Sequence, residues 1–475
     1  MTLEGHPVSS RRFPVTGGLH RALLYGLLLC YSLAFGLSVA MGRWVALVLV
    51  VAPLLCALVY LQPGLGLALT LAVFYLGERL VGLGYLPQAI EWLPDLVVLA
   101  LLFRVLVMAR RRHIDPGGPV AWAAIALGIL AVASALVNGM DLTATIVGLR
   151  YLFRFVALYF AIINLGLSRA SLRRLVNALV IIALAQVPIC LAQFWVHGSV
   201  GDTNSGTMQI YGGEEMAFVC TASAVILLSL YFQGSRRLWP LLAAAALMIP
   251  GLAAGARGAS LVFFPLALLL ALVLNLRRPG RALARRVGVA GFLFALIAAL
   301  MVGSSVFGTL LSRNTFSGLG EVIATESISG LEFGRLTSVE NAASMVKEEP
   351  LGAVVGLGPG ATGKNQFAFG RAREMVSVTG AFRVQVAASI VELGYPGLAV
   401  MLAIPLLTLL GLPPLRAYRD PYWVALRIAV PGVLLMYVVY FSYYAIWIGG
   451  ASSILLWMLV AAVRATGRQS MAVTA

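Results

Sequence analysis

Residues 175–196 read LVNALVIIALAQVPICLAQFWV and contain no charged side chain. A helix of about 20 mostly apolar residues is long enough to cross the hydrocarbon core of a bilayer. Similar runs recur along the chain, whose 475 residues are 61% hydrophobic and only 11% charged. A soluble fold has too little interior to hide so much apolar surface. The sequence therefore predicts an all-α polytopic integral membrane protein, and it excludes a soluble enzyme, a disordered chain, a coiled coil and a disulfide scaffold.

The apolar runs predict about 12–14 transmembrane helices. The run 65–86 is the weakest, because Glu78 and Arg79 interrupt it. The short runs 238–254 and 259–275 meet at the sequence Gly-Ala-Arg-Gly, which predicts a hairpin whose tip dips below the membrane surface. The predicted spans are 22–41, 44–62, 65–86, 92–109, 119–138, 143–165, 175–196, 215–233, 238–254, 259–275, 287–306, 386–412, 422–445 and 450–464.

The spans divide the chain into three parts. Residues 1–306 hold about eleven spans and residues 386–475 about three, with one large loop outside the membrane over residues 307–385. A stretch of this loop from Arg335 to Val346 has apolar residues at helical spacing, which predicts a short amphipathic helix on the membrane surface. The apolar positions of that helix are Leu336, Val339, Ala343 and Val346.

Basic residues set the expected orientation. The chain has 34 Lys and Arg against 18 Asp and Glu, a formal net charge of +16. Cytoplasmic loops of membrane proteins collect Lys and Arg, so this excess needs no nucleic-acid partner. A cytoplasmic N-terminus puts the arginine-rich connections on the cytoplasmic side, whereas the loops at 138–139, 198–213 and 449–453 carry no arginine. We therefore expect both termini in the cytoplasm and the large loop on the opposite, external side.

Two arginines lie inside a predicted span. Arg150 and Arg154 are four residues apart in GLRYLFRF, and so share one helix face. An arginine at the centre of a span costs about 2.5–3.5 kcal/mol on insertion scales, so it usually faces a cavity or a partner. One interpretation is a cationic site for a phosphate or diphosphate. The alternatives are snorkelling, or a structural pair with an acidic residue such as Glu78 or Asp95.

Three further charged residues lie at or near span ends. Arg257 is in the turn between the short spans, where broken helices commonly hold ligands, although a plain tight turn would also carry it. Arg383 ends the large loop, and Glu392 follows nine residues later inside a span. For Glu392 the alternatives are a structural ion pair and a carboxylate that lines a hydrated cavity.

Other kinds of site are excluded or weak. The large loop has no histidine, so a histidine base on the external side is limited to His197. The carboxylates of the first external loop form no metal-binding cluster, and Gly356–Gly360 lacks the GK[ST] ending of a nucleotide loop. We therefore expect no metal and no cofactor. Glu214 and Glu215 open a span, where the helix N-terminus favours negative charge and capping is the simpler explanation.

Four segments, in this order, resemble the O-antigen ligase and O-antigen polymerase superfamily of bacterial envelope glycan assembly. The first is the arginine-bearing span and the second a turn of the Ser/Ala-Arg-Gly type that opens a span. The third is a surface helix followed by a Pro-Leu-x-Gly-x-Gly-x-Gly type of pattern, and the fourth is an xxELGxxGL signature. Their sequences are GLRYLFRFVALYFAIIN (148–164), GARGASLVFFPLALLLALVL (255–274), RLTSVENAASMVKEEPLGAVVGLGPG (335–360) and VELGYPGL (391–398).

The resemblance covers roughly residues 140–415 and implies metal-independent glycosyl transfer on the periplasmic face of a bacterial inner membrane. The donor would be an undecaprenyl-diphosphate-linked glycan, the acceptor another glycan, and other polysaccharide assembly proteins would be partners beside the lipid bilayer. By position, Arg150 and Arg154 match the span arginines of the family and Arg257 matches its turn arginine, which implies that these three bind the diphosphate. We further expect catalytic roles for Arg257, Arg383 and Glu392, where Arg383 orients the donor or acceptor and either Glu392 or a carboxylate of the large loop activates the acceptor hydroxyl. Arg335 and Lys364 are weaker candidates for contacts to the glycan.

One departure from the family pattern bears on the type of transfer. Ligases of the family carry a His-Asn pair some nine residues before the Glu of ELG, where this chain has Arg383 and Val384. This favours a polymerase of an exopolysaccharide or a similar glycan over a ligase that transfers O-antigen to lipid A–core. An alternative of another class is a flippase for lipid-linked oligosaccharides, although the sequence lacks the two related halves that transporters commonly have.

Overall fold

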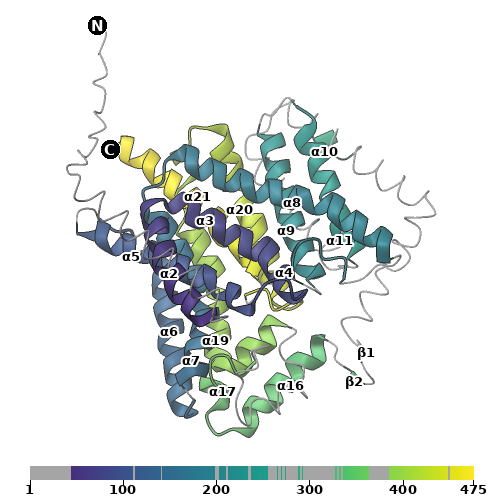
Figure 1. Ribbon diagram of the computed structural model, residues 1–475. Coiled ribbons are helices and arrows are strands. Elements are labelled where there is room, and N and C mark those ends of the chain that lie inside the picture. The colour runs from purple at the N-terminus through teal and green to yellow at the C-terminus, as the bar shows by residue number, and fades with distance from the viewer. Residues whose placement is uncertain are drawn as a thin grey trace. The chain divides into compact units, whose positions relative to one another are not determined.

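Apolar helices make up most of the described part of the computed structural model (Figure 1). The chain forms two compact units, Met1–Leu61 and Gln62–Ala475. In the first unit one helix is described, α2 (Trp44–Leu61), which carries no charged residue. The structure describes residues 44–110, 113–140, 142–197, 203–209, 212–233, 237–254, 335–362, 384–447 and 450–474, with a few positions between 265 and 332.

The second unit is a sequence of helices joined by short connections. A pair of two-residue strands, β1 (Ser327–Ile328) and β2 (Leu331–Glu332), runs antiparallel before the last helices. The helices before these strands are α3 (Pro63–Ala72), the π-helix η1 (Val73–Gly77), α4 (Glu78–Gly82), the 3-10 helix η2 (Gln88–Trp92), α5 (Leu93–Ala109), α6 (Pro119–Val137), α7 (Leu142–Asn164), α8 (Arg169–His197), α9 (Gly213–Phe232), α10 (Trp239–Ala246) and α11 (Met248–Ala253). The helices after them are α16 (Arg335–Glu348), α17 (Gly352–Val355), α19 (Gln385–Leu410), the 3-10 helix η5 (Leu415–Ala417), α20 (Pro421–Tyr440) and α21 (Gly450–Thr474).

Nine helical segments within the described ranges are long and apolar enough to cross a membrane. This confirms the prediction of an all-α polytopic membrane protein. Most observed and predicted ends lie within about four residues of each other, as for Pro119–Val137 against the predicted 119–138. Three ends differ more, since Arg169–Val196 begins before the predicted 175, Pro421–Tyr440 ends before the predicted 445, and Gly450–Met471 continues past the predicted 464. The predicted span 238–254 instead breaks into the short helices α10 and α11. The predicted spans 22–41, 259–275 and 287–306 lie wholly or mostly outside the described residues.

Two helices, α9 and α21, form the centre of the second unit. Nearly every side chain of α9 is buried, and α21 is buried from Gly450 to Ala465. Helices that are apolar all round belong in such positions. α9 packs against α8, α10, α11 and α20, and α21 packs against α7 and α20. A series of aromatic contacts connects α9 and α21 through α20. The distances between ring centroids are 5.9 Å for Phe218 and Tyr437, 6.4 Å for Tyr437 and Trp447, and 5.9 Å for Trp447 and Trp457.

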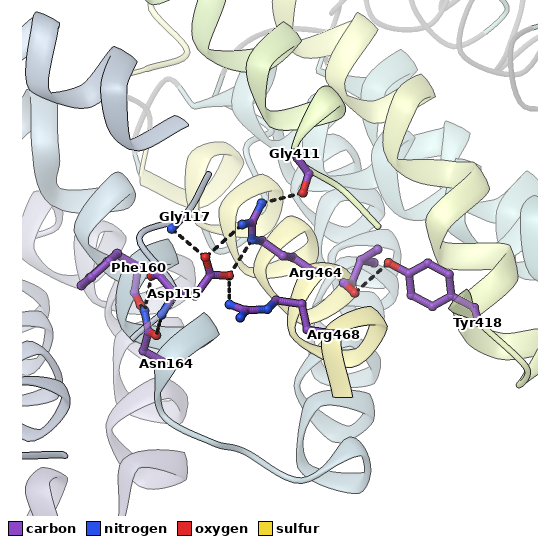
Figure 2. Close-up of polar contacts among 9 residues, drawn as sticks. Asp115, Gly117, Phe160, Asn164, Gly411, Tyr418, Arg464 and Arg468 are labelled. Carbon is purple, nitrogen blue, oxygen red and sulfur yellow. Dashed lines mark hydrogen bonds and ion pairs between the residues drawn. The ribbon is translucent and has the colours of Figure 1, made fainter. Parts of the chain in front are cut away.

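A cluster of charges joins four segments at one end of this unit (Figure 2). Asp115, in the connection between α5 and α6, accepts hydrogen bonds from Arg464 Nε and Nη2, each over 3.0 Å, and pairs with Arg468. Arg464 also donates to the carbonyl of Gly411 at the end of α19. Asn164, at the end of α7, exchanges two hydrogen bonds with the backbone of Asp115. We call this the Asp115 cluster.

The Asp115 cluster lies among connections that the sequence placed on one side of the membrane. Nearby, Arg173 pairs with Asp420 and Arg169 donates to Ser470. Connections expected on the opposite side also contact one another, since Asn138 donates to the carbonyl of Gly356. The alternation of the predicted spans is thus consistent with the contacts. Which end faces the cytoplasm stays a prediction.

Part of the large loop packs on the helical bundle. The predicted amphipathic helix is present as α16. Of its predicted apolar positions Val346 is buried and Val339 packs against the apolar cluster that contains it, but the rest of the buried face is different. Leu336 is 56% exposed, whereas Ser338, Ala342, Met345 and Val346 are buried. The reason is the position of α19, which α16 and α17 both contact. An apolar cluster of α16, the segment after α17 and the start of α19 fills this contact.

Candidate functional site

Four of the seven predicted site residues fall in the described ranges, namely Arg150, Arg154, Arg335 and Glu392. All four belong to the end of the second unit that holds α16, α17 and the connection between α8 and α9. Arg257, Lys364 and Arg383 lie outside the described residues.

Arg150 and Arg154 share one carboxylate. Arg150 Nε lies 2.7 Å from Asp95 Oδ2, and Arg154 Nε lies 2.7 Å from Asp95 Oδ1. Arg150 Nη2 also donates to the carbonyl of Glu91 over 2.6 Å, and its guanidinium lies 3.9 Å from the centroid of the Trp92 ring. The sequence alternative of a structural pair with Asp95 is therefore present in the fold. Two guanidinium groups on one carboxylate leave a net positive charge at this point.

The glycine-rich segment after α17, residues 356–362, is hydrogen-bonded to the kink of α19. Leu357 N–H donates to the carbonyl of Val391 over 2.6 Å, and Gly358 N–H donates to the carbonyl of Glu392 over 3.1 Å. Gly394 has φ of +68°, which breaks the helical path inside α19. Gly356 has φ of +73°, and a Cβ there would lie 2.4 Å from the backbone of Glu392. These positions need glycine because of both the backbone conformation and the close approach.

The carboxylate of Glu392 faces this same segment. Its Oε1 accepts hydrogen bonds from the backbone N–H of Thr362, over 3.3 Å, and from the Thr362 hydroxyl. The side chain is buried, and no ion pair of Glu392 exists with the described residues. Glu392 therefore anchors the end of the glycine-rich segment. The structural ion pair considered from the sequence is not seen in the described part of the chain.

The glycine-rich segment also contacts α7, at Gly148. A Cβ on Gly148 would lie 2.3 Å from the carbonyl of Pro359, so only glycine allows this contact. Arg150 is two residues further along α7, so its side chain points to a different face of the helix, where it meets Asp95. The segments 148–164, 335–360 and 391–398, which are far apart in the sequence, thus meet at one end of the second unit.

A second polar group lies where α16 begins. Arg335 Nε donates to the carbonyl of Tyr443 over 2.8 Å, and its guanidinium lies 3.8 Å from the centre of the Tyr443 ring. Arg335 Nη2 is 3.7 Å from Glu214 Oε1, and both side chains are mostly buried. This ion pair joins the large loop to the first turn of α9. Sequence reasoning missed the pair, because nothing in either segment indicates that they meet.

Glu215 stabilises a different helix from the one it opens. Its Oε1 accepts a hydrogen bond from the backbone N–H of Ser452 over 3.1 Å, in the first turn of α21. Its Oε2 accepts from Gln209 Nε2 over 3.2 Å. The N-cap of α9 is Gly212, which has no side chain to cap the helix. Both glutamates lie in the first turn of α9, as expected from the sequence, while the backbone N–H that Glu215 accepts belongs to α21.

Neither a protein-family model nor a curated protein matches this chain. The part of the chain that the structure describes contains no group of three or more His, Cys, Asp or Glu residues suited to a metal ion. The function is therefore argued from the geometry of this end of the molecule.

Proposed function

We propose that this protein is a membrane glycosyltransferase that polymerises undecaprenyl-diphosphate-linked oligosaccharide units into a surface polysaccharide or exopolysaccharide. The reaction would take place on the periplasmic face of a bacterial inner membrane, with both termini of the chain in the cytoplasm. The observation that supports this most is the meeting of α7, the glycine-rich segment and the kink of α19. These are three of the four segments on which the family resemblance depends.

The proposed reaction needs cations for a leaving diphosphate. The acceptor hydroxyl oxygen attacks the anomeric carbon of the donor, the new glycosidic bond forms, and the bond from that carbon to the diphosphate oxygen breaks. Undecaprenyl diphosphate leaves with the electron pair, so positive charge near its oxygens stabilises the transition state. Arg150 and Arg154 carry one charge more than Asp95 neutralises, and they lie on the helix whose Gly148 contacts the glycine-rich segment. Arg257 would add to them.

The acceptor proton needs a base. We assign this role to Glu392, whose carboxylate is held by Thr362 at the end of the glycine-rich segment. Arg383 precedes α19 and would orient the donor or the acceptor. Arg335 and Lys364, both in the large loop, would contact the glycan. A general base must lie within hydrogen-bond reach of the proton it takes, so Glu392 has to become accessible when the acceptor binds.

The direct experiment uses purified full-length protein in liposomes with an oligosaccharide linked to undecaprenyl diphosphate. A ladder of longer lipid-linked glycans supports the proposal. Transfer to added lipid A–core without chain growth would identify a ligase instead. Movement of unaltered substrate across the bilayer would identify a flippase and would refute the proposal. Glu392→Gln is expected to abolish the ladder while the protein keeps its elution volume and melting temperature.

A further inference from the structure

The connection between α8 and α9 contains an irregular segment, residues 203–209, most of which is buried although Thr203 is exposed. Asn204, Ser205 and Met208 have no exposed surface. Irregular backbone within the spanning region of a membrane protein is tolerated only where protein buries it or where it lines a hydrated cavity. Transporters use such non-helical backbone to build substrate sites. The burial of this segment therefore calls for an explanation.

Two glutamines of α8 hold the segment by its backbone. Gln193 donates to the carbonyl of Gly206 over 2.7 Å and accepts from the Gly206 N–H over 2.8 Å. Gln186 accepts from the N–H of Thr207 over 2.8 Å and donates to the Thr207 hydroxyl over 3.0 Å. The two glutamines are seven positions apart, which puts both on one face of α8. The segment thus has a fixed conformation set by neutral amides.

The fixed segment orients Arg79. Arg79 Nη1 donates to the Ser205 hydroxyl over 2.8 Å and to the carbonyl of Met208 over 3.5 Å. Arg79 lies in α4, directly after the π-helix η1, and its side chain is half-buried. Single π-turns inside helices are frequent at functional sites. From the sequence, Arg79 was noted only because it interrupts the third predicted span.

Arg79 differs from the other arginines at this end of the molecule. Arg150, Arg154 and Arg335 each pair with a carboxylate, whereas Arg79 has no ion pair with any residue in the described ranges. Its Nε and Nη2 nitrogens make no hydrogen bond there either. A guanidinium has five N–H donors, so most of them remain for a ligand. A charged side chain within a span usually marks a substrate path or a partner.

We propose that Arg79, held by residues 203–209, binds a phosphate group of the lipid-linked donor. Guanidinium groups match phosphate oxygens in geometry and in charge. This inference rests on the proposed function, because that function supplies a diphosphate lipid as the substrate. It adds a phosphate contact on α4 to those proposed for α7 and for the turn at Arg257.

The test is binding of undecaprenyl diphosphate without a sugar to purified full-length protein in detergent, measured by native mass spectrometry. Arg79→Gln is expected to weaken binding by about tenfold or more. Arg79→Lys is expected to weaken it by less, because lysine keeps the positive charge but lacks the paired N–H donors of the guanidinium group. Ser205→Ala, which removes the hydroxyl that orients Arg79, is expected to weaken binding by a few-fold. The matched control is Arg427→Gln. Arg427 is a half-buried span arginine with no carboxylate partner in the described ranges, and it donates to the Pro413 carbonyl at the other end.

The control and a second lipid make the outcomes decisive. Unchanged binding by Arg79→Gln, or equal weakening by Arg427→Gln, would overturn the inference. Phosphatidylglycerol that binds as tightly as undecaprenyl diphosphate, with the same dependence on Arg79, would assign the site to a phospholipid and would also overturn it. The melting temperatures of the four variants serve as a control. If they lie within a few degrees of that of the unsubstituted protein, the differences in binding arise from the site and not from unfolding.

The binding test is separate from the test of the proposed function. If the protein extends glycan chains but Arg79→Gln binds the lipid normally, the proposed function stands and the inference fails. If the protein binds the diphosphate lipid through Arg79 but extends no glycan, the inference stands and the proposed function fails.

Discussion

Two clusters in this protein have the same composition, one aspartate with two arginines four residues apart on one helix. In the Asp115 cluster the arginines are Arg464 and Arg468 on α21, and at the other end of the second unit Asp95 holds Arg150 and Arg154 on α7. The surroundings differ. Asp115 also accepts the Gly117 N–H, and its backbone is bonded to Asn164 (Figure 2).

The difference shows that the same combination of three side chains has different roles in the two clusters. The Asp115 cluster joins the ends of α7 and α19 to α21 and to the connection before α6, so its charges fix the relative positions of helices. The Asp95 cluster joins α7 to η2 and to the start of α5, which are consecutive in the chain, so it links fewer distant segments. We infer that the first cluster serves stability and that the second holds two cations ready for an anion.

The largest effect on stability is expected from Asp115→Asn. This substitution leaves the buried Arg464 without its carboxylate, and it also removes the partner of Arg468, which is 43% exposed. Removal of one partner from a buried ion pair costs about 3–5 kcal/mol. The free energy of unfolding in detergent, from denaturant titration, measures the loss. A change below about 1 kcal/mol would mean that the cluster does not hold the helices together.

A smaller loss of stability is expected from Asp95→Asn. The Asp95 side chain is 17% exposed, compared with 6% for Asp115, and Asp115 also accepts the Gly117 N–H, so a substitution at Asp115 breaks more buried hydrogen bonds. Hydrogen bonds to charged groups contribute about 1.5–3 kcal/mol, and we expect a loss of that size in the same titration. If Asp95→Asn destabilises the protein more than Asp115→Asn does, the contrast between the two clusters is wrong.

Acid should weaken the Asp115 cluster. Burial alone would raise the pKa of Asp115, but the hydrogen bonds from Arg464, Gly117 and Arg468 outweigh it, so the pKa is lowered. A carboxyl with a lowered pKa in the folded state stabilises the protein above its unfolded pKa of about 3.9. That contribution is lost as pH falls below about 4. Melting temperatures between pH 6 and pH 3 should therefore fall less steeply for Asp115→Asn than for the unsubstituted protein.

The smallest effect is expected at the exposed pair of Arg173 and Asp420, which lies near the Asp115 cluster. Their closest nitrogen and oxygen atoms are 3.9 Å apart, and both side chains are about half exposed. Exposed ion pairs contribute about 0–1 kcal/mol. Arg173→Ala should therefore change the free energy of unfolding by less than about 1 kcal/mol. A larger loss of unfolding free energy would show that an exposed ion pair at this end of the molecule stabilises the fold as much as a buried one, which would contradict the contrast.

The sequence predicted the spans well but the site only in outline. Runs such as 119–138 are visible because membrane helices need continuous apolar length, which is a local property. The buried face of α16 was not predictable, because it depends on where α19 lies. The hydrogen bond of Thr362 to Glu392 and the ion pair of Arg335 with Glu214 were not predictable either, because each joins segments that are far apart in the sequence. Gln186 and Gln193, by contrast, stand out in an otherwise apolar run and could have indicated a buried polar contact.

The most direct test compares Arg150→Gln with Arg468→Gln in the chain-growth assay. Each substitution removes one arginine and leaves the other on its aspartate, so the two variants are matched in charge. We predict that Arg150→Gln lowers the rate of chain growth per folded protein by about tenfold or more. We predict that Arg468→Gln leaves this rate within about twofold of the unsubstituted protein. Equal losses in both variants, or no loss in Arg150→Gln, would contradict the account.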